Sequence, residues 1–108
     1  MTAANALLFN QDGMLSLTAL SLDADGFLDP DSVRSALGCR AVETVAAAAL
    51  VAFVSADPES ERAPFSPPTT NAIREMLCAA GSTRAPAVYG SAIIVGPHVP
   101  LRPEMAVA

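Results

Sequence analysis

The densest group of residues that could do chemistry is the acidic segment Ser21–Asp29, with the sequence Ser-Leu-Asp-Ala-Asp-Gly-Phe-Leu-Asp. Its carboxylates stand third, fifth and ninth and its glycine sixth, which is the order of an EF-hand calcium loop. Two ligand positions of such a loop hold Ser21 and Ser32 instead of an aspartate and a glutamate. The alternative is an Asp-Gly turn that leads into a helix. The calcium candidates are the loop carboxylates Asp23, Asp25 and Asp29.

Groups that could act as a catalytic acid, base or nucleophile are few. The only histidine, His98, lies in a proline-containing stretch, and the chain has no lysine. A general base must be held rigidly within hydrogen-bonding distance of its target, which such a stretch does not favour. Cys39 and Cys78 are too few for a four-ligand zinc site, and we expect two buried, reduced thiols. We therefore predict a protein that is not an enzyme and has no catalytic residue, metal or cofactor.

The charge balance indicates which partners the surface can attract. Eleven acidic and six basic residues give a net charge of −5 at pH 7. This argues against direct nucleic-acid binding, which needs clustered positive charge, and against anionic membrane surfaces. The longest apolar run, Ala46–Val54, is too short to cross a bilayer, and Met1–Phe9 lacks the pattern of a targeting segment. A cytoplasmic location and a protein partner are expected.

Hydrophobic periodicity indicates the elements that carry the acidic segment. Met14–Leu22 alternates apolar and polar residues, with a change of phase after Ala19, and predicts a strand with a bulge. Ala6–Phe9 is its expected hairpin partner. Asp29-Pro30-Asp31 has the capping and proline chemistry of a helix start, and Gly38 is the expected stop.

The second half of the chain continues with strands, a loop and a helix. Ala41–Val54 predicts two strands or one long bent strand, and its four alanines Ala46–Ala49 also suit a helix. Four prolines make Asp57–Pro68 an expected surface loop. The second helix is expected to be capped by Thr70 or Asn71 and to end at Gly81.

The β-branched run Val88–Val95 predicts a last, buried strand. The order of elements predicts an α/β (α+β) fold, with a small mixed β-sheet of about four to five strands and two helices packed on one face. Residues 1–97 are expected to form a single α/β domain and residues 98–108 an extended C-terminal tail. Met14 and Met76 are expected to fill the core.

Several short motifs resemble a known family. Asp31–Val45 contains a short helix, the pair Gly38-Cys39 and then Val-Glu-Thr-Val, and it resembles the signature of domain-of-unknown-function family 3846. Pro68 with Asn71 resembles the family's helix entry, and Tyr89–Gly96 resembles its closing strand. Cys39 replaces the second glycine of the family pattern. The family consists of small proteins common in phages, plasmids and conjugative elements, and it supplies no catalytic residue to carry over.

The resemblance, which covers most of residues 15–97, implies an accessory protein of a mobile genetic element. With the acidic balance, it suggests a non-catalytic protein that binds another protein, encoded by the host or by the element, and inhibits or regulates a host defence system. The alternatives are a self-assembling scaffold subunit held by Val88–Val95 and the C-terminal arm, and a small metal- or ligand-binding domain. The predicted partner-binding residues are the acidic side chains Asp23, Asp25, Asp29, Asp31, Glu59 and Glu61.

Overall fold

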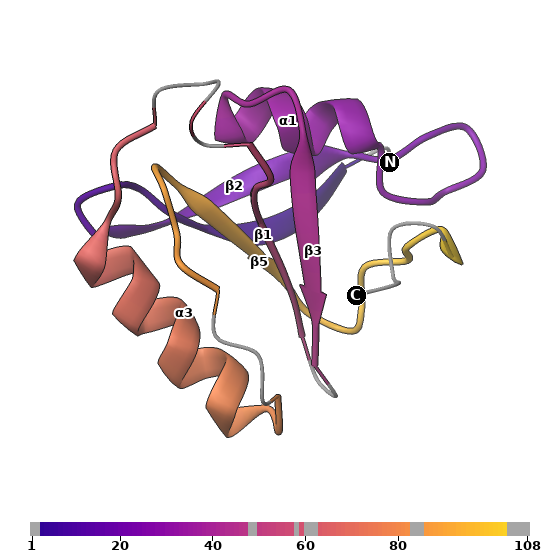
Figure 1. Cartoon of the computed structure of the whole chain (residues 1–108). Helices are drawn as coiled ribbons and strands as arrows, with labels where there is room; N and C mark the ends of the chain where they lie inside the picture. Colours follow the sequence, from indigo (N-terminus) through magenta and orange to yellow (C-terminus); the bar gives the residue numbers. More distant parts are fainter. Residues whose placement is uncertain (1–2, 48–49, 58, 60–62, 83–85, 104–108) are drawn as a thin grey trace.

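A computed structural model describes residues 3–47, 50–57, 59, 63–82 and 86–103. These residues form a five-stranded antiparallel sheet and two helices, which confirms the predicted α+β class (Figure 1). The elements are β1 Ala3–Phe9, β2 Leu15–Ser21, α1 Pro30–Leu37, β3 Val42–Ala46, β4 Val51–Ser55, α3 Pro67–Ala79 and β5 Ala92–Val95. The strand order is β2-β1-β5-β4-β3, so β2 and β3 are the edges of the sheet.

The predicted mixed sheet is wrong, because every pair of neighbouring strands is antiparallel. β1 with β2 and β3 with β4 are hairpins, as their short connections require. The connection from β4 to β5 passes through α3 and then returns, since Tyr89 forms a bridge with Phe65, just before the helix. The chain therefore enters β5 from the end of the sheet at which it left β4.

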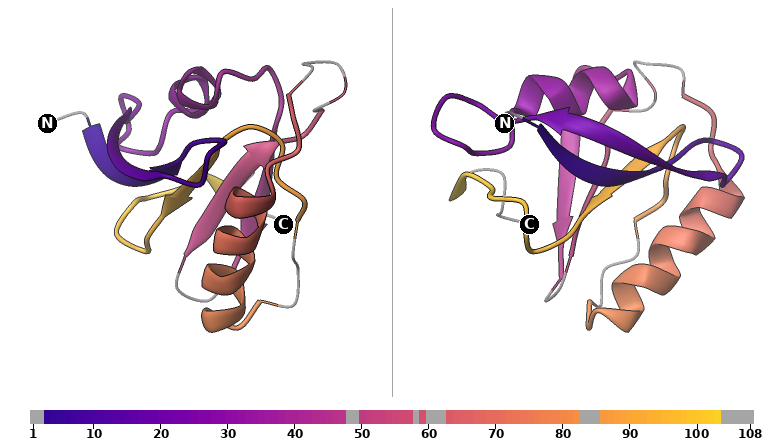
Figure 2. Two further views of the ribbon diagram at one scale, coloured as in Figure 1. Left: turned by 90° about the vertical axis from the view of Figure 1, so that its left-hand side faces the viewer. Right: turned by 180° about the vertical axis from the view of Figure 1, so that it is seen from behind.

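The two helices lie on opposite faces of the sheet, not on one face as predicted (Figure 2). Ile73 of α3 packs with Ala52 and Ile94, whereas Val33 of α1 packs with the alternate residues, including Phe53. The central strands β4 and β5 are apolar at nearly every position, so each has two faces to bury. One helix cannot cover both faces.

β2 shows why the periodicity of its segment changes phase. Its pairing with β1 runs without interruption from Ala3↔Ser21 to Phe9↔Leu15, so the predicted bulge is absent. Leu20 is buried on the α1 side of the sheet, whereas Leu15 and Leu17 point to the α3 side and remain exposed. The two apolar phases are the two faces of one regular strand.

Both helix starts follow capping chemistry, but at one of them the prediction was wrong by a turn. In α1, Asp29 accepts a hydrogen bond from the Asp31 backbone N–H at 3.1 Å, and Gly38 closes the helix at φ 70°, both as predicted. α3 begins at Pro67 with Ser66 as its cap, instead of at Thr70 or Asn71. Two prolines assigned to the loop fit the first helical turn, where no N–H donor is needed.

The turn between β1 and β2 is fastened to the start of α3. The Thr69 hydroxyl donates a hydrogen bond of 2.6 Å to the Asn10 carbonyl. Gly13 has φ +80°, and a Cβ built on it would lie 2.8 Å from the Pro68 Cβ. The turn therefore requires glycine both for its backbone conformation and for this close approach.

The described part of the predicted tail packs onto the domain. Val99 is buried in the cluster on the α1 side of the sheet, and the Leu28 N–H donates to the Pro100 carbonyl at 2.9 Å. Residues 98–103 thus extend the domain beyond residue 97.

The last strand is shorter than predicted and occupies a central position. Gly90 has φ 78°, and regular pairing begins only at Ala92. Because β5 pairs with β1 on one side and β4 on the other, it offers no free edge through which a second copy of the chain could be held.

Candidate functional site

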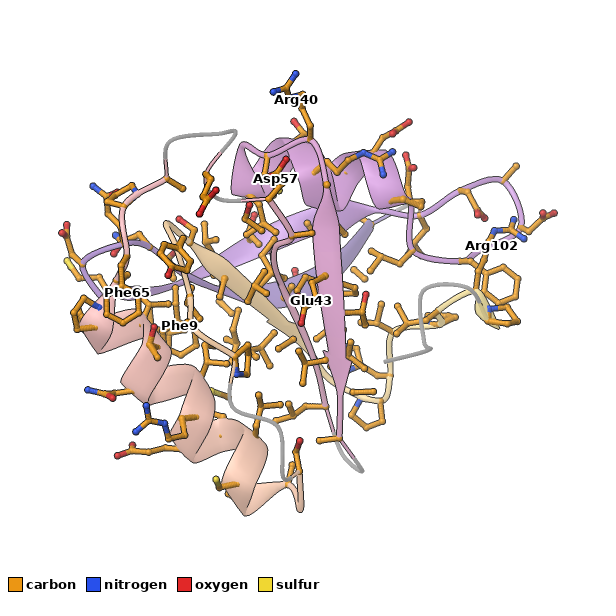
Figure 3. The ribbon with its side chains drawn as sticks, in the orientation of Figure 1. Phe9, Arg40, Glu43, Asp57, Phe65 and Arg102 are labelled. Carbon is orange, nitrogen blue, oxygen red and sulfur yellow. The ribbon has the colours of Figure 1, made fainter. Side chains whose placement is uncertain are left out.

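The first two predicted aspartates form a cluster with one arginine from the end of the described chain. Asp23 Oδ1 accepts hydrogen bonds from the backbone N–H groups of Asp25 and Phe27, at 2.9 and 3.0 Å. Arg102 donates to Asp23 Oδ2 and Asp25 Oδ2, both at 2.9 Å. Its guanidinium also lies 4.8 Å from the centroid of the Phe27 ring. Figure 3 shows Arg102 beside this loop, on the side of the molecule away from α3.

The same contacts control the ionisation of the cluster. Partial desolvation pushes the pKa of Asp23 upward, but the hydrogen bonds from the Phe27 N–H, the Arg102 side chain and the Asp25 N–H outweigh it and hold that pKa below its ordinary value. The hydrogen bonds to Asp25 and Asp23 raise the pKa of Arg102. Both partners are charged at neutral pH, so part of the negative charge of this loop is neutralised within the chain.

The other predicted acidic residues have separate positions. Asp29 caps α1, and Asp31 forms an ion pair with Arg34 one turn along the same helix. Glu59 is exposed, and Glu61 lies outside the described residues.

Metal binding gains no support from this arrangement. In the part of the chain that the structure describes, no group of three or more His, Cys, Asp or Glu side chains is placed to hold a metal ion. The oxygens of the candidate calcium loop instead accept the hydrogen bonds of its turn, of the helix start and of Arg102.

Two residues expected in the core, Cys78 and Met14, lie at the surface. Cys78 is exposed and Cys39 half-buried, so the predicted burial of both thiols is wrong. On α3, Cys78 follows the buried Leu77 and is turned away from the sheet. Met14 is 66% exposed, because it precedes β2 and faces no covering element.

Sequence reasoning did not predict an apolar groove of about 370 Å³ on the α3 side of the sheet. Its apolar lining comes from β1, β2, β5, α3 and the β3–β4 turn, and includes Leu7, Leu17, Leu50, Met76 and Ile94. Asn5 and His98 also line the apolar groove. Leu17 is 75% exposed and Leu15 is 55% exposed, so the sheet is uncovered beside the groove.

The outer side of β2 is the second feature that the sequence did not predict. Ser21 donates its N–H to the Ser32 hydroxyl at 2.8 Å and accepts at its carbonyl from the Asp29 N–H at 3.0 Å, so both groups point away from β1. Along an antiparallel strand this orientation recurs at every second residue. The backbone groups of Leu15, Leu17 and Ala19 therefore also point outward, and no described strand pairs with them.

We call residues Leu15–Ala19 the β2 edge. It contains no charged residue and no proline, two devices with which proteins commonly protect exposed strand edges. Two features of the sequence could have indicated this edge: Met14–Leu22 contains no charged residue, and its leucines occur on both faces of the predicted strand. Because the change of phase predicted a bulge, the exposed apolar face formed by Leu15 and Leu17 was not predicted.

Comparison with protein-family models, with curated proteins and with solved structures finds no match to this chain. The resemblance to the family of unknown function stays a prediction. Among the described residues, no helix has the length and apolar character needed to cross a membrane. A proposal for the binding surface therefore rests on the geometry of the described residues.

Proposed function

We propose that this protein is a non-catalytic binding protein whose apolar groove receives apolar side chains of another protein. The observation that carries the proposal is Leu17, which is 75% exposed at a groove also lined by Leu7 and Met76. Contiguous exposed apolar surface is unfavourable in water and is typical of interaction sites. The aspartate cluster is less suited to this role, because Arg102 already binds two of its carboxylates.

The biological setting that we propose is an accessory gene of a mobile genetic element, such as a phage or plasmid. Its support is the resemblance of Asp31–Val45 and Tyr89–Gly96 to the family motifs. In this setting the partner is a protein of the host or of the element, and binding inhibits or regulates a host defence system. The net charge of −5 favours a partner with a basic rim around its apolar contact.

Affinity capture from a host lysate tests the groove with two matched variants of α3. Met76→Glu places a carboxylate in the groove, whereas Cys78→Glu adds the same charge at an exposed position outside the groove lining. Burying an unpaired charge is costly, so we expect Met76→Glu to reduce recovery of the specific partner by about tenfold or more. The Cys78→Glu protein should recover it as the wild type does.

Because Met76 packs against the core, the thermal unfolding of both variants must be compared first. A folded Met76→Glu protein that still recovers the same partner at wild-type yield would contradict the proposal. So would a wild-type protein that recovers no partner above the level of an unrelated acidic bait.

A further inference from the structure

We propose that the β2 edge pairs with the β2 edge of a second copy of the chain. The two strands run antiparallel about a twofold axis, with Leu17 opposite Leu17 of the second copy, and the two sheets become one. This inference goes beyond the proposed function, since it concerns contacts between identical chains and does not depend on any other partner.

The backbone supplies the first argument. Leu15, Leu17 and Ala19 direct their N–H and C=O groups outward, as the bonds of Ser21 to Ser32 and Asp29 establish. The contacts of Ser21 close one end of the edge, and no other described strand faces the five residues Leu15–Ala19. An antiparallel pair of identical strands satisfies both copies by the same contacts, which is the condition for a closed twofold interface.

The side chains favour one register. With Leu17 at the axis, Leu15 faces Ala19 of the second copy on the groove side, and Ser16 faces Thr18 on the α1 side. Every pair then joins apolar to apolar or hydroxyl to hydroxyl, which are favourable cross-strand combinations. A shift of the axis to Thr18 would place Leu15 opposite Ser21, whose backbone groups already have partners.

Charge favours a second copy over a basic partner at this edge. The protein carries a net charge of −5, yet β1 and β2 contain no charged residue. Two copies can therefore approach through this side without placing like charges opposite each other. A basic strand would find no carboxylate within the edge to pair with.

The twofold arrangement also affects the apolar groove. A twofold axis perpendicular to the sheet keeps equivalent faces together, so α3 of both copies lies on the same side. Leu17, which lines the groove of its own copy, then brings the two grooves next to each other across the junction. Each copy thereby covers part of the exposed leucine surface of the other.

Sedimentation velocity over a range of protein concentrations tests the pairing with two matched variants. Leu17→Arg and Met14→Arg each remove an exposed apolar side chain and add one positive charge. Only Leu17→Arg places two like charges directly opposite each other, so we expect its dimer dissociation constant to rise by about tenfold or more. For Met14→Arg we expect a change of less than about threefold, because residue 14 lies outside the paired segment.

Added salt sharpens the same experiment. Screening reduces the repulsion between two acidic copies, so the wild-type dimer should become tighter as ionic strength increases. A wild-type protein that stays monomeric at every concentration would overturn the proposal. A dimer that Leu17→Arg leaves unchanged, or one that salt dissociates, would do the same.

Disulfide formation tests the register and remains decisive if Leu17→Arg fails to fold. Directly opposite residues of a hydrogen-bonded antiparallel pair have Cα atoms about 5.5 Å apart, within the range that a disulfide can bridge. In a Cys39→Ser, Cys78→Ser background, Leu17→Cys should give a covalent dimer under mild oxidation, at least about tenfold faster than Met14→Cys. Equal rates for the two, or no covalent dimer with Leu17→Cys, would overturn the proposed pairing.

Discussion

The aspartate cluster and the β2 edge differ in whether their polar groups already have partners. In the cluster, Asp23 accepts two backbone hydrogen bonds and binds Arg102, which also binds Asp25. At the edge, no strand of the described residues pairs with the outer side of Leu15–Ala19, and Leu17 is largely exposed. The carboxylates of the aspartate cluster thus already have partners within the chain, whereas the outer backbone groups of the β2 edge have none among the described strands.

This difference indicates how an interaction surface should be sought in a small acidic protein. An exposed carboxylate that already binds an arginine gains little from a new partner, since it must exchange one ion pair for another. Unpaired strand backbone and exposed leucines gain both hydrogen bonds and apolar burial when they are covered. The β2 edge therefore has more to gain from binding than the aspartate cluster.

The largest expected effect distinguishes the two faces of β2. Leu20 is 1% exposed on the α1 side, whereas Leu17 is 75% exposed on the groove side. We expect Leu20→Ala to lower the free energy of unfolding by about 2–5 kcal/mol, because it leaves a cavity in the core. Leu17→Ala should change it by less than about 0.5 kcal/mol in a monomeric sample.

Urea unfolding at low protein concentration measures both values. Equal losses for the two variants would mean that Leu17 is covered within its own chain. The proposed pairing would then lack its exposed apolar surface.

An intermediate effect distinguishes the turn that supports β2 from the aspartate loop. Gly13 and Gly26 have nearly equal φ values, +80° and +86°, but only at Gly13 would a Cβ meet another atom, the Pro68 Cβ at 2.8 Å. Both alanine variants should lose about 1–2 kcal/mol for the left-handed backbone. Gly13→Ala should lose more than Gly26→Ala, because the start of α3 must also shift.

Thermal unfolding of the two variants side by side measures this difference. If Gly26→Ala is the more destabilised protein, the docking of the turn on α3 contributes less to stability than the structure indicates.

The smallest effect concerns the pH dependence of the aspartate cluster. Its hydrogen bonds hold the pKa of Asp23 below the ordinary value, so the unfolded chain takes up the proton first as pH falls. The stabilisation is complete well above the unfolded pKa of about 3.9 and is lost as pH falls through the lower folded value. Arg102→Gln should therefore be slightly less stable than the wild type at pH 7.

Unfolding curves from pH 7 down to pH 2.5 should show this difference shrinking toward zero on the acid side. Arg74→Gln, the same substitution at an exposed position of α3 outside the cluster, serves as the control. A difference between Arg102→Gln and the wild type that is independent of pH would show that Arg102 acts through its packing on Phe27 instead of its charge.

Local chemistry accounts for the parts of the fold that could be predicted from the sequence. The start and end of α1 follow from Asp29, Pro30 and Gly38, whose effects act within one turn. At α3, Ser66-Pro67-Pro68 has the same chemistry, but the proline-rich segment next to it indicates a loop instead of a helix start. Local signals were sufficient only where the neighbouring sequence did not resemble a turn.

The remaining features depend on contacts between residues far apart in the chain. Arg102 binds Asp23 although the two residues are 79 positions apart in the chain. The sequence of the acidic loop alone therefore does not show that its carboxylates already have a partner. Which helix covers which face of the sheet is decided by strand order, which brings β5 between β1 and β4. Leu17 is exposed as a result of that order, because α3 covers another part of the same face of the sheet.

Hydrogen exchange of individual backbone amides, measured by NMR at several protein concentrations, tests the free β2 edge most directly. We predict that the Leu17 amide exchanges rapidly in dilute protein and becomes protected as concentration rises, while the Ser21 amide, bonded to Ser32, is protected throughout. A Leu17 amide that is protected in dilute monomer, or that exchanges rapidly at every concentration, would contradict the proposed pairing.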